Sequence, residues 1–335
     1  MSRSARRWSE GKNVSAPVRV GILGSTSTIA RLAVIPAIEK SSSCTLAATA
    51  SGSDRGATYS SYDALLDDPD VEAVYIPLPN SLHREWTERS ASAGKHVLCE
   101  KPLAATATDA LAMAQACASA GVVLMEAYMT RFHPRDAKIQ QLVTQGVIGD
   151  LLFTTAAFTF ELRRADDHRW RPEMGGGALL DVGIYCLTPM LAAAGVNPSS
   201  LARLRQVTGV AHRAPLGVDA SYSGWLDLGE GRSASFQCSF EAPERQILEI
   251  VGTDAALFVN RPFTPGPEDR VIQVRRKDHS TEEVTTEGAD PYLLMVEHFG
   301  AVVRHDAELE RTPVESVALQ QLVDRFIEAA EVPTT

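Results

Sequence analysis

The stretch VRVGILGSTSTIA, residues 18–30, decides the fold class, because a short apolar run passes through one glycine into a helical pattern. Gly24 allows the tight turn that a dinucleotide-binding strand–turn–helix unit needs. The residues after it offer backbone N–H groups and hydroxyls at a helix start, where anions bind favourably. The second and third glycines of the usual G-x-G-x-x-G fingerprint are missing. The stretch predicts a pyrophosphate site, with a Ser/Thr-rich cap on an ordinary helix as the alternative.

The first third of the chain alternates short apolar runs with helical patterns. Runs suited to strands buried on both faces of a parallel sheet lie at 18–24, 45–51, 72–79, 96–102 and 122–129. Helical patterns lie between them at 28–40, 61–67, 81–93 and 105–120, and the last stops at Gly121. This alternation predicts an α/β Rossmann-type fold with a doubly wound parallel sheet.

Longer, alternating segments after residue 150 predict an α+β domain whose antiparallel sheet is covered by helices on one face. They lie at 150–162, 203–212, 219–229, 231–241, 245–253 and 270–278, and a turn at Glu230-Gly231 predicts a hairpin. We therefore expect a disordered extension (1–16), a dinucleotide-binding Rossmann domain (17–135), an α+β domain for substrate binding and oligomerisation (136–312), and a C-terminal helix that packs back on the body (313–335).

Composition excludes several classes of protein. The chain of 335 residues carries a net charge of -10, which argues against broad nucleic-acid or membrane-surface binding. No apolar run approaches the roughly 20 residues of a spanning helix, and the polar opening segment lacks the apolar middle of a secretory signal. Five widely spaced cysteines without a C-x-x-C pair predict reduced thiols in a cytoplasmic protein. The scattered histidines and cysteines predict no metal site.

The end of the second predicted strand bears on the choice of cofactor. NAD-specific sites usually place an acidic residue there to hold the ribose hydroxyls, whereas an arginine accommodates a 2′-phosphate. This chain has Ser51, Gly52 and Ser53, with Arg55 just beyond. These residues favour NADP over NAD, although Asp54 points the other way.

Four further segments carry a resemblance to a known family. They are YIPLPNSLHREW (75–86), GKHVLCEKP (94–102), MEAYMTRFHP (125–134) and GGGALLDVGIYCL (175–187). In this order they resemble the Gfo/Idh/MocA family of sugar-type oxidoreductases, over nearly the whole chain. The resemblance implies a nucleotide-binding domain followed by a domain on an open, mostly antiparallel sheet, and subunits that pack these sheet faces together. The chain departs from the family at STST (25–28), a loop one residue longer than usual that lacks its second glycine.

The resemblance also implies catalytic residues. Family members place the lysine of the EKP motif, here Lys101, in the active site, and a strand end is where such sheets bind ligands. Asp181 and Tyr185 are four residues apart and share one helix face. Many relatives carry a proton-transferring histidine at the Tyr185 position. With tyrosine at this position, the chain resembles the family members that act on sugar-nucleotide ketones, the glucose–fructose oxidoreductases and the dihydrodiol dehydrogenases.

Lys101 and Tyr185 could each have a catalytic role or a purely structural one. We expect the Lys101 cation to lower the pKa of the Tyr185 phenol from about 10, and Asp181 to hold Lys101 or a substrate hydroxyl. The alternatives are a surface lysine in an ion pair and a core tyrosine bonded to a backbone carbonyl.

The remaining candidates form two groups. Cofactor contacts are predicted at Gly24, Ser25, Thr26, Ser27, Thr28, Ile29, Ser51, Ser53, Arg55, Pro77, Leu78, Asn80, His83, Glu100 and Lys101. Substrate contacts are predicted at Tyr128, Arg131, His133, Arg163, His168, Trp170 and Arg171. The alternatives are a helix-start role for His83, an ion pair for Arg131, and a solvated loop whose arginines pair with Asp166, Asp167 and Glu173.

Together with the resemblance, these residues predict NADPH-dependent reduction of a keto group on a nucleotide-linked deoxysugar, of the 3-keto-6-deoxyhexose type. The basic and aromatic cluster at 161–174 favours such a substrate, because it could bind a diphosphate and stack a base. An NADP-dependent dehydrogenase of a free sugar, cyclitol or aromatic dihydrodiol is the alternative. A non-catalytic nucleotide sensor would need neither Lys101 nor Tyr185. We expect a cytoplasmic homodimer or homotetramer that binds a small-molecule substrate and neither nucleic acid nor membrane.

Overall fold

A five-stranded parallel sheet forms the N-terminal layer of the computed structural model, which describes residues 16–53, 56–197, 201, 204 and 206–331. Its strands are β1 (Val18–Leu23), β2 (Cys44–Ala50), β3 (Ala73–Ile76), β4 (His96–Glu100) and β5 (Leu124–Ala127). The strand order is β2-β1-β3-β4-β5, so the order reverses between β1 and β3. Ligands of doubly wound sheets bind at this switch point, outside the carboxyl ends of the strands. The predicted extension lies almost wholly outside the described residues.

Helices connect these strands as the alternation predicts. They are η1 (Ala30–Val34), α1 (Ile35–Lys40), α2 (Tyr62–Leu66), α3 (His83–Ser92) and α4 (Ala107–Ala120). Ser61 and Thr106 cap α2 and α4 by accepting backbone N–H groups, and α4 ends at Gly121 with φ 68°. The predicted Rossmann-type sheet is therefore confirmed.

An eight-stranded sheet forms the second layer. Its strands are β6 (Leu151–Glu161), β7 (Val207–Arg213), β8 (Asp219–Gly229), β9 (Arg232–Ser239), β10 (Glu241–Gly252), β11 (Ala255–Asn260), β12 (Val271–Arg276) and β13 (Thr281–Thr285). The order is β13-β12-β11-β10-β6-β9-β8-β7, with only β6 and β9 parallel among these pairs. Glu230 and Gly231 both have positive φ, which is the two-residue turn that the hairpin prediction requires. The open, mostly antiparallel sheet is confirmed.

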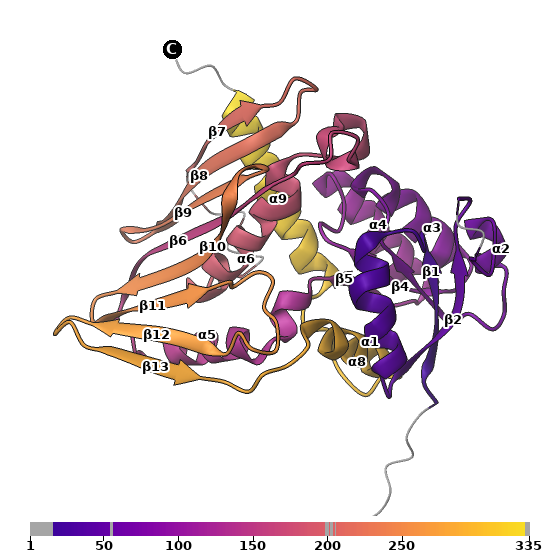
Figure 1. Ribbon diagram of the computed structural model, residues 1–335, viewed down its shortest axis with the longest axis horizontal. Helices are drawn as coiled ribbons and strands as arrows, with labels where there is room; N and C mark the ends of the chain where they lie inside the picture. Colours follow the sequence, from indigo (N-terminus) through magenta and orange to yellow (C-terminus); the bar gives the residue numbers. More distant parts are fainter. Residues whose placement is uncertain (1–15, 54–55, 198–200, 202–203, 205, 332–335) are drawn as a thin grey trace, which may run out of the picture.

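Helices from distant parts of the sequence lie between and beside the two sheets (Figure 1). They are α5 (Pro134–Thr144), α6 (Ile184–Ala193), α8 (Pro291–Val303) and α9 (Pro313–Glu331). The last, α9, touches both α4 and β7 and so joins the two layers, whereas α8 packs against α1 and β2. The chain thus returns to the Rossmann layer after completing the second sheet.

One described helical stretch, Pro172–Ala193, is long and apolar enough to cross a membrane by composition. Most of it is buried within the fold, as in a core helix of a soluble protein. All five cysteines are free and buried, as predicted.

Candidate active site

Lys101, Asp181 and Arg169 form a chain of charges at the carboxyl end of β4. The Lys101 Nζ donates to Asp181 Oδ1 and to the Asp181 carbonyl oxygen, both at 2.8 Å. The other carboxylate oxygen accepts Arg169 Nη1 at 3.2 Å. Although burial opposes it, these two cations hold the pKa of Asp181 below its ordinary value. An ionised carboxylate therefore orients the lysine, and the lysine is not a surface residue.

The helix that carries Asp181 and Tyr185 starts directly after the glycine triplet. Its first turn is a π-helix, Leu179–Gly183 (η6), which continues into α6. Asp219 on β8 caps it, with Oδ2 accepting the Leu179 N–H at 2.7 Å. Because the helix start is fixed by the sheet, Asp181 and Tyr185 both reach Lys101, whose Nζ lies 4.8 Å from the centre of the Tyr185 ring.

Besides the Lys101 ammonium, aromatic side chains surround the Tyr185 ring. Tyr128 and Phe158 pack against its ring at 5.1 and 5.6 Å, and its hydroxyl lies 3.9 Å from Met129 Sδ. Burial raises the pKa of Tyr185 well above its ordinary value, with further increments from Tyr292 and Glu100. The expectation that Lys101 lowers this pKa is wrong, because loss of hydration dominates at this depth. The phenol is neutral and protonated at physiological pH.

Buried groups hold the turn that follows Lys101. The Lys101–Pro102 peptide is cis. Glu126 at the end of β5 accepts the Leu103 N–H at 3.0 Å, and pairs with Arg311 at 3.1 Å. Tyr75 donates to Glu100 Oε1 at 2.6 Å. The position of Lys101 is therefore set by contacts from β3 and β5, its neighbours on either side of β4.

The turn after β1, where the sequence predicts a pyrophosphate, depends on its glycine. Gly24 has φ +105°, and a Cβ there would lie 2.9 Å from Leu78 Cδ2, so only glycine fits. Ser25 is buried, Thr26 and Thr28 are exposed, and helical structure begins at Thr28. This helix start follows the carboxyl end of β1, at the switch point of the sheet, where doubly wound sheets bind their ligands.

The 2′-phosphate prediction is only partly visible in the structure. Ser51 is buried after β2, its hydroxyl accepts the Ser53 N–H at 3.2 Å, and Ser53 is exposed. Arg55 and Asp54 lie outside the described residues. The Ser51 and Ser53 hydroxyls lie 3.3 Å apart, close to the turn after β1, where Gly24 N–H donates to the Ala50 carbonyl.

Comparison with known proteins identifies the family. The oxidoreductase family described as "NAD-binding Rossmann fold" (GFO_IDH_MocA) matches residues 18–128, and the GFO/IDH/MocA C-terminal domain matches residues 137–258. The chain belongs to the Gfo/Idh/MocA family of oxidoreductases. The resemblance inferred from the four motifs is thereby confirmed.

Relatives in this family differ in substrate. The D-xylose 1-dehydrogenase (NADP(+)) 2 of Haloferax volcanii is 35% identical, over 93% of this chain and 97% of its own. The dTDP-3,4-didehydro-2,6-dideoxy-alpha-D-glucose 3-reductase of Streptomyces violaceoruber is 36% identical, over 86% of this chain and 85% of its own. KijD10, a 3-ketoreductase from Actinomadura kijaniata solved with NADP and TDP-benzene, superposes with a TM-score of 0.84 at 29% identity, covering 93% and 98% of the two chains.

The glycine triplet at 175–177 allows other segments of the chain to pack closely against its backbone. A Cβ on Gly177, which has φ +119°, would lie 2.2 Å from Asp219 Oδ1, and one on Gly176 would lie 2.3 Å from the Arg169 carbonyl. The Gly175 carbonyl accepts Asn80 Nδ2 at 2.8 Å. The triplet therefore joins the PLPN segment, the 161–174 loop and the β8 cap, a role that the sequence alone did not predict.

His83 lies in the core, not at the cofactor turn. It is 0% exposed, its Nδ1 lies 3.1 Å from the Pro102 carbonyl, and its Nε2 lies 2.8 Å from the Leu78 carbonyl. Since its ring nitrogens face these carbonyls, His83 ties the PLPN segment to the turn after Lys101. Pro77 is buried, while Leu78 and Asn80 are half-buried.

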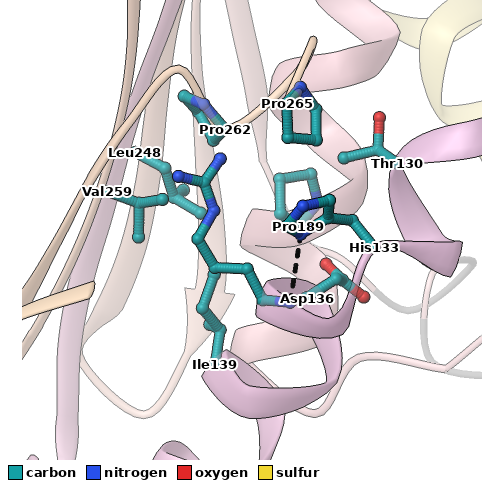
Figure 2. Close-up of a pocket in the computed structure, with 10 residues that line it drawn as sticks. Thr130, His133, Asp136, Ile139, Pro189, Leu248, Val259, Pro262 and Pro265 are labelled. Carbon is teal, nitrogen blue, oxygen red and sulfur yellow. Dashed lines mark hydrogen bonds between the residues drawn. The ribbon is translucent and has the colours of Figure 1, made fainter. Parts of the chain in front are cut away.

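Three predicted substrate residues lie behind the site. Tyr128 is 2% exposed and donates to the Tyr185 carbonyl at 3.3 Å. Arg131 pairs with Glu310 at 2.7 Å and Asp136 at 3.6 Å, the ion-pair alternative. His133 is 1% exposed and lines a small pocket with three prolines and the aliphatic Ile139, Leu248 and Val259, where its Nδ1 accepts the Arg135 N–H (Figure 2).

The 161–174 loop divides between surface pairs and site residues. Arg163 and Arg164 are exposed and pair with Glu161 and Asp166, as in the solvated-loop alternative. Trp170 packs edge-on against Phe240 at 5.4 Å. The other two predicted contacts of this loop, His168 and Arg171, are exposed.

His168 is exposed, and its Nδ1 lies 3.5 Å from Asp167 Oδ1, an oxygen that also accepts Arg169 Nε. Arg171 is exposed, and its backbone carbonyl accepts the Gly176 N–H at 3.0 Å.

Asp219 shapes the site although it was not a predicted site residue, and Glu126, which was predicted to line the cleft, supports the turn after Lys101 instead. Asp219 lies 40 residues after Leu179, whose N–H it accepts, so no local sequence pattern predicts the contact. Glu126 belongs to MEAYMTRFHP, but its carboxylate points to Leu103 N, Ser316 Oγ and Arg311. In the described part of the chain, no three His, Cys, Asp or Glu side chains are grouped to hold a metal ion.

Proposed function

We propose that the protein is an NADP-dependent reductase of a keto group on a nucleotide-linked deoxysugar. The observation that carries the proposal is the meeting of an oriented lysine and a neutral tyrosine at the switch-point edge of the dinucleotide sheet. Sugar 3-reductases and 3-ketoreductases among the relatives support a substrate of the 3-keto-6-deoxyhexose type. The NADP-bound relatives support NADP as the cofactor.

Residues of the chain would hold that cofactor at two places. The N–H groups of Thr26, Thr28 and Ile29 and the hydroxyls of this turn would contact a pyrophosphate, whereas the N–H groups of Gly24, Ser25 and Ser27 donate to backbone carbonyls. Ser51 and Ser53 would provide hydroxyls for a 2′-phosphate. Bound NADPH supplies a hydride to the carbonyl carbon. Both parts of the site lie at the carboxyl ends of β1 and β2, the edge that also carries Lys101.

Lys101 and Tyr185 would act on the carbonyl oxygen of the substrate in different ways. Two Nζ–H groups of Lys101 are bonded to Asp181, so one remains to donate to the substrate oxygen and stabilise its developing negative charge. Tyr185 keeps its proton because burial raises its pKa, and it then gives that proton to the nascent alkoxide. Hydride and proton together convert the ketone to an alcohol.

The 161–174 loop supports the nucleotide part of the proposal. Arg171 is exposed, and His168 lies near Lys101, so an arginine and an imidazole stand at the rim of the site. Arginine binds diphosphate oxygens with paired hydrogen bonds. We propose these two residues, rather than Arg163 and Arg164, as contacts of the nucleotide.

A dehydrogenase of a free sugar is the second candidate. The xylose dehydrogenase relative, 35% identical over 93% of this chain, favours it. The same lysine and tyrosine would serve that reaction in reverse, but Tyr185 must then be a phenolate to accept the proton of the substrate hydroxyl, a state that burial disfavours. The two candidates differ in whether the protein recognises a nucleotide.

Titration with dTDP tests this difference without turnover. The NADP-loaded protein should bind dTDP in a saturable manner, and Arg171→Gln should weaken binding about tenfold because a charge-assisted hydrogen bond is lost. Arg276→Gln is the matched control, since Arg276 pairs with Glu282 on the distant β12–β13 hairpin. No binding of dTDP, together with NADP reduction by D-xylose, would transfer the assignment to the second candidate.

Location and assembly are further proposals. We propose a cytoplasmic protein, in keeping with its free buried thiols, and a homo-oligomer that forms through the uncovered face of the second sheet. The side chains on that face include Phe153, Val210 and Trp225, which are 40%, 65% and 39% exposed.

A further inference from the structure

Arg169 is held between two carboxylates at the edge of the site. Its Nε donates to Asp167 Oδ1 at 2.9 Å and its Nη2 to Asp167 Oδ2 at 3.1 Å, a two-point pair. Its Nη1 donates to Asp181 Oδ2 at 3.2 Å. The side chains of all three residues are mostly buried, so the pairs are poorly screened by solvent.

The backbone of Arg169 is fixed as firmly as its side chain. Its N–H donates to Asp167 Oδ1, and its carbonyl accepts the Gly177 N–H at 3.0 Å. The guanidinium also lies 5.5 Å from the ring centre of Phe160. Arg169 therefore has one accessible arrangement, in which it connects the 161–174 loop with the start of the active-site helix.

The two oxygens of Asp181 are thereby assigned to different cations. Oδ1 receives Lys101 and Oδ2 receives Arg169, so the plane of the carboxylate is fixed. Without Arg169, the carboxylate could rotate and one ammonium would neutralise it alone. Its negative charge would also lie near Asp167 with no cation between them.

We propose that Arg169 is a positioning residue that acts through Asp181, fixing the carboxylate so that Lys101 directs its remaining N–H toward the substrate oxygen. The inference rests on the proposed function for the identity of the substrate, but not for the arrangement of the charges. Arg169 itself touches neither the cofactor nor the substrate in this scheme. Its loss should therefore affect the chemical step more than substrate affinity.

The test compares Arg169→Gln and Arg169→Lys with the wild type from about pH 3.5 to pH 9, because the pKa of Asp181 lies below its ordinary value, and uses NADPH oxidation by the accepted ketone. A small misplacement of a reacting group can cost about 100-fold in rate, so we expect kcat of the Gln variant to fall between about 10-fold and 100-fold. KM should change less than about threefold. The acid limb of kcat should move up by about one pH unit, because Asp181 loses a neighbouring cation. The Lys variant should recover part of kcat.

Asp167→Asn gives an independent variant, since it weakens the hold on Arg169 while leaving Arg169 in place. It should shift kcat and the acid limb in the same direction by a smaller amount. Arg276→Gln should leave both unchanged. Circular dichroism and NADPH fluorescence confirm that each variant is folded and binds cofactor.

Two results would overturn the proposal. One is a large rise in KM at constant kcat, which would make Arg169 a substrate contact. The other is a fall in kcat with an unchanged acid limb and no recovery in the Lys variant, which would make its role purely structural. If the wild type oxidises a free sugar and reduces no nucleotide-linked ketone, the proposed function fails, and the same variants are then compared on that sugar.

Discussion

Lys101 is the residue on which the chemistry depends, and its surroundings explain why it is held in place. Asp181 binds it twice, and the Tyr185 ring lies beneath its ammonium. Sequence alone could propose these three residues because they belong to compact motifs. Sequence could not place His83, Arg131 or His133, because burial and partners far along the chain decide whether such side chains face a ligand or the core.

Removing the lysine ammonium should abolish most of the rate. Lys101→Met keeps the aliphatic stem but loses the donor to the substrate oxygen, and we expect kcat to fall about 100-fold to 1,000-fold. Steady-state NADPH oxidation measures the change, and NADPH fluorescence reports cofactor binding. Lys138→Met on α5, whose ammonium donates to Gln141 Oε1 on the same helix, is the control. Near-normal kcat in the Lys101 variant would remove the lysine from the mechanism.

The tyrosine makes a prediction about pH. Burial holds the pKa of Tyr185 well above its ordinary value of about 10, so the phenol stays protonated and the supply of donor does not decline between pH 6 and 9. Ultraviolet titration of tyrosinate between pH 6 and 9 should therefore give the same curve for the wild type and for Tyr185→Phe. A phenolate assigned to Tyr185 below pH 9 would mean that the lysine, rather than burial, controls the group.

At the scale of elements, the start of the active-site helix matters most. Asp219 of β8 caps that helix, and Gly177 makes room for the carboxylate. The strand and helix patterns predicted most elements, but the helices α5 and α8 and the strands β11 and β13 were missed. β11 follows β10 after a turn without a strong signal, and β13 (TEEVT) is polar and almost wholly exposed, so it lacks the alternation that marks a half-buried strand.

The cap makes a prediction about stability. Asp219→Ala leaves helix N–H groups unpaired, so the free energy of unfolding should fall by about 1–2 kcal/mol, measured by urea denaturation. The same variant should lower kcat, because the position of Asp181 depends on this helix start. Unchanged stability would show that the helix start is held without the cap.

The pKa of Asp219 gives the cap a pH dependence that can be tested separately. Burial raises the Asp219 pKa from 3.8 to about 6. The native state then binds more protons than the unfolded chain between those values, so stability falls as pH rises through this window. Asp219→Asn, which keeps an acceptor oxygen but cannot ionise, should show a smaller fall. An equally steep fall in Asp219→Asn would assign the effect to other carboxyls.

At the scale of the whole molecule, the two sheets have different surroundings. The Rossmann sheet is covered on both sides, whereas helices cover the second sheet on one side (Figure 1). Strand pairing places Trp225 opposite Ser235 and Thr208, on the face away from these helices. The alternating segments after residue 150 predicted a sheet covered by helices on one face, and only the family resemblance implied that a second subunit packs on the other face.

Assembly through that face predicts a size change on mutation. Trp225→Glu should convert the oligomer to monomer, because a charge would be buried without a partner. Sedimentation equilibrium measures the mass. Leu111→Glu, at an apolar residue of α4 that is 46% exposed, is the matched control and should keep the oligomer. An oligomer that survives Trp225→Glu would place the interface elsewhere.

The central claim is that this site reduces a nucleotide-linked ketone. The most direct measurement is NADPH oxidation with a dTDP-linked 3-keto-6-deoxyhexose generated in the assay, with NADH and free sugars run in parallel. We expect rapid oxidation of NADPH with the nucleotide-linked ketone and slow rates in the parallel assays. No turnover of that ketone, together with reduction of NADP by D-xylose or a dihydrodiol, would show that the protein is a dehydrogenase of free substrates instead.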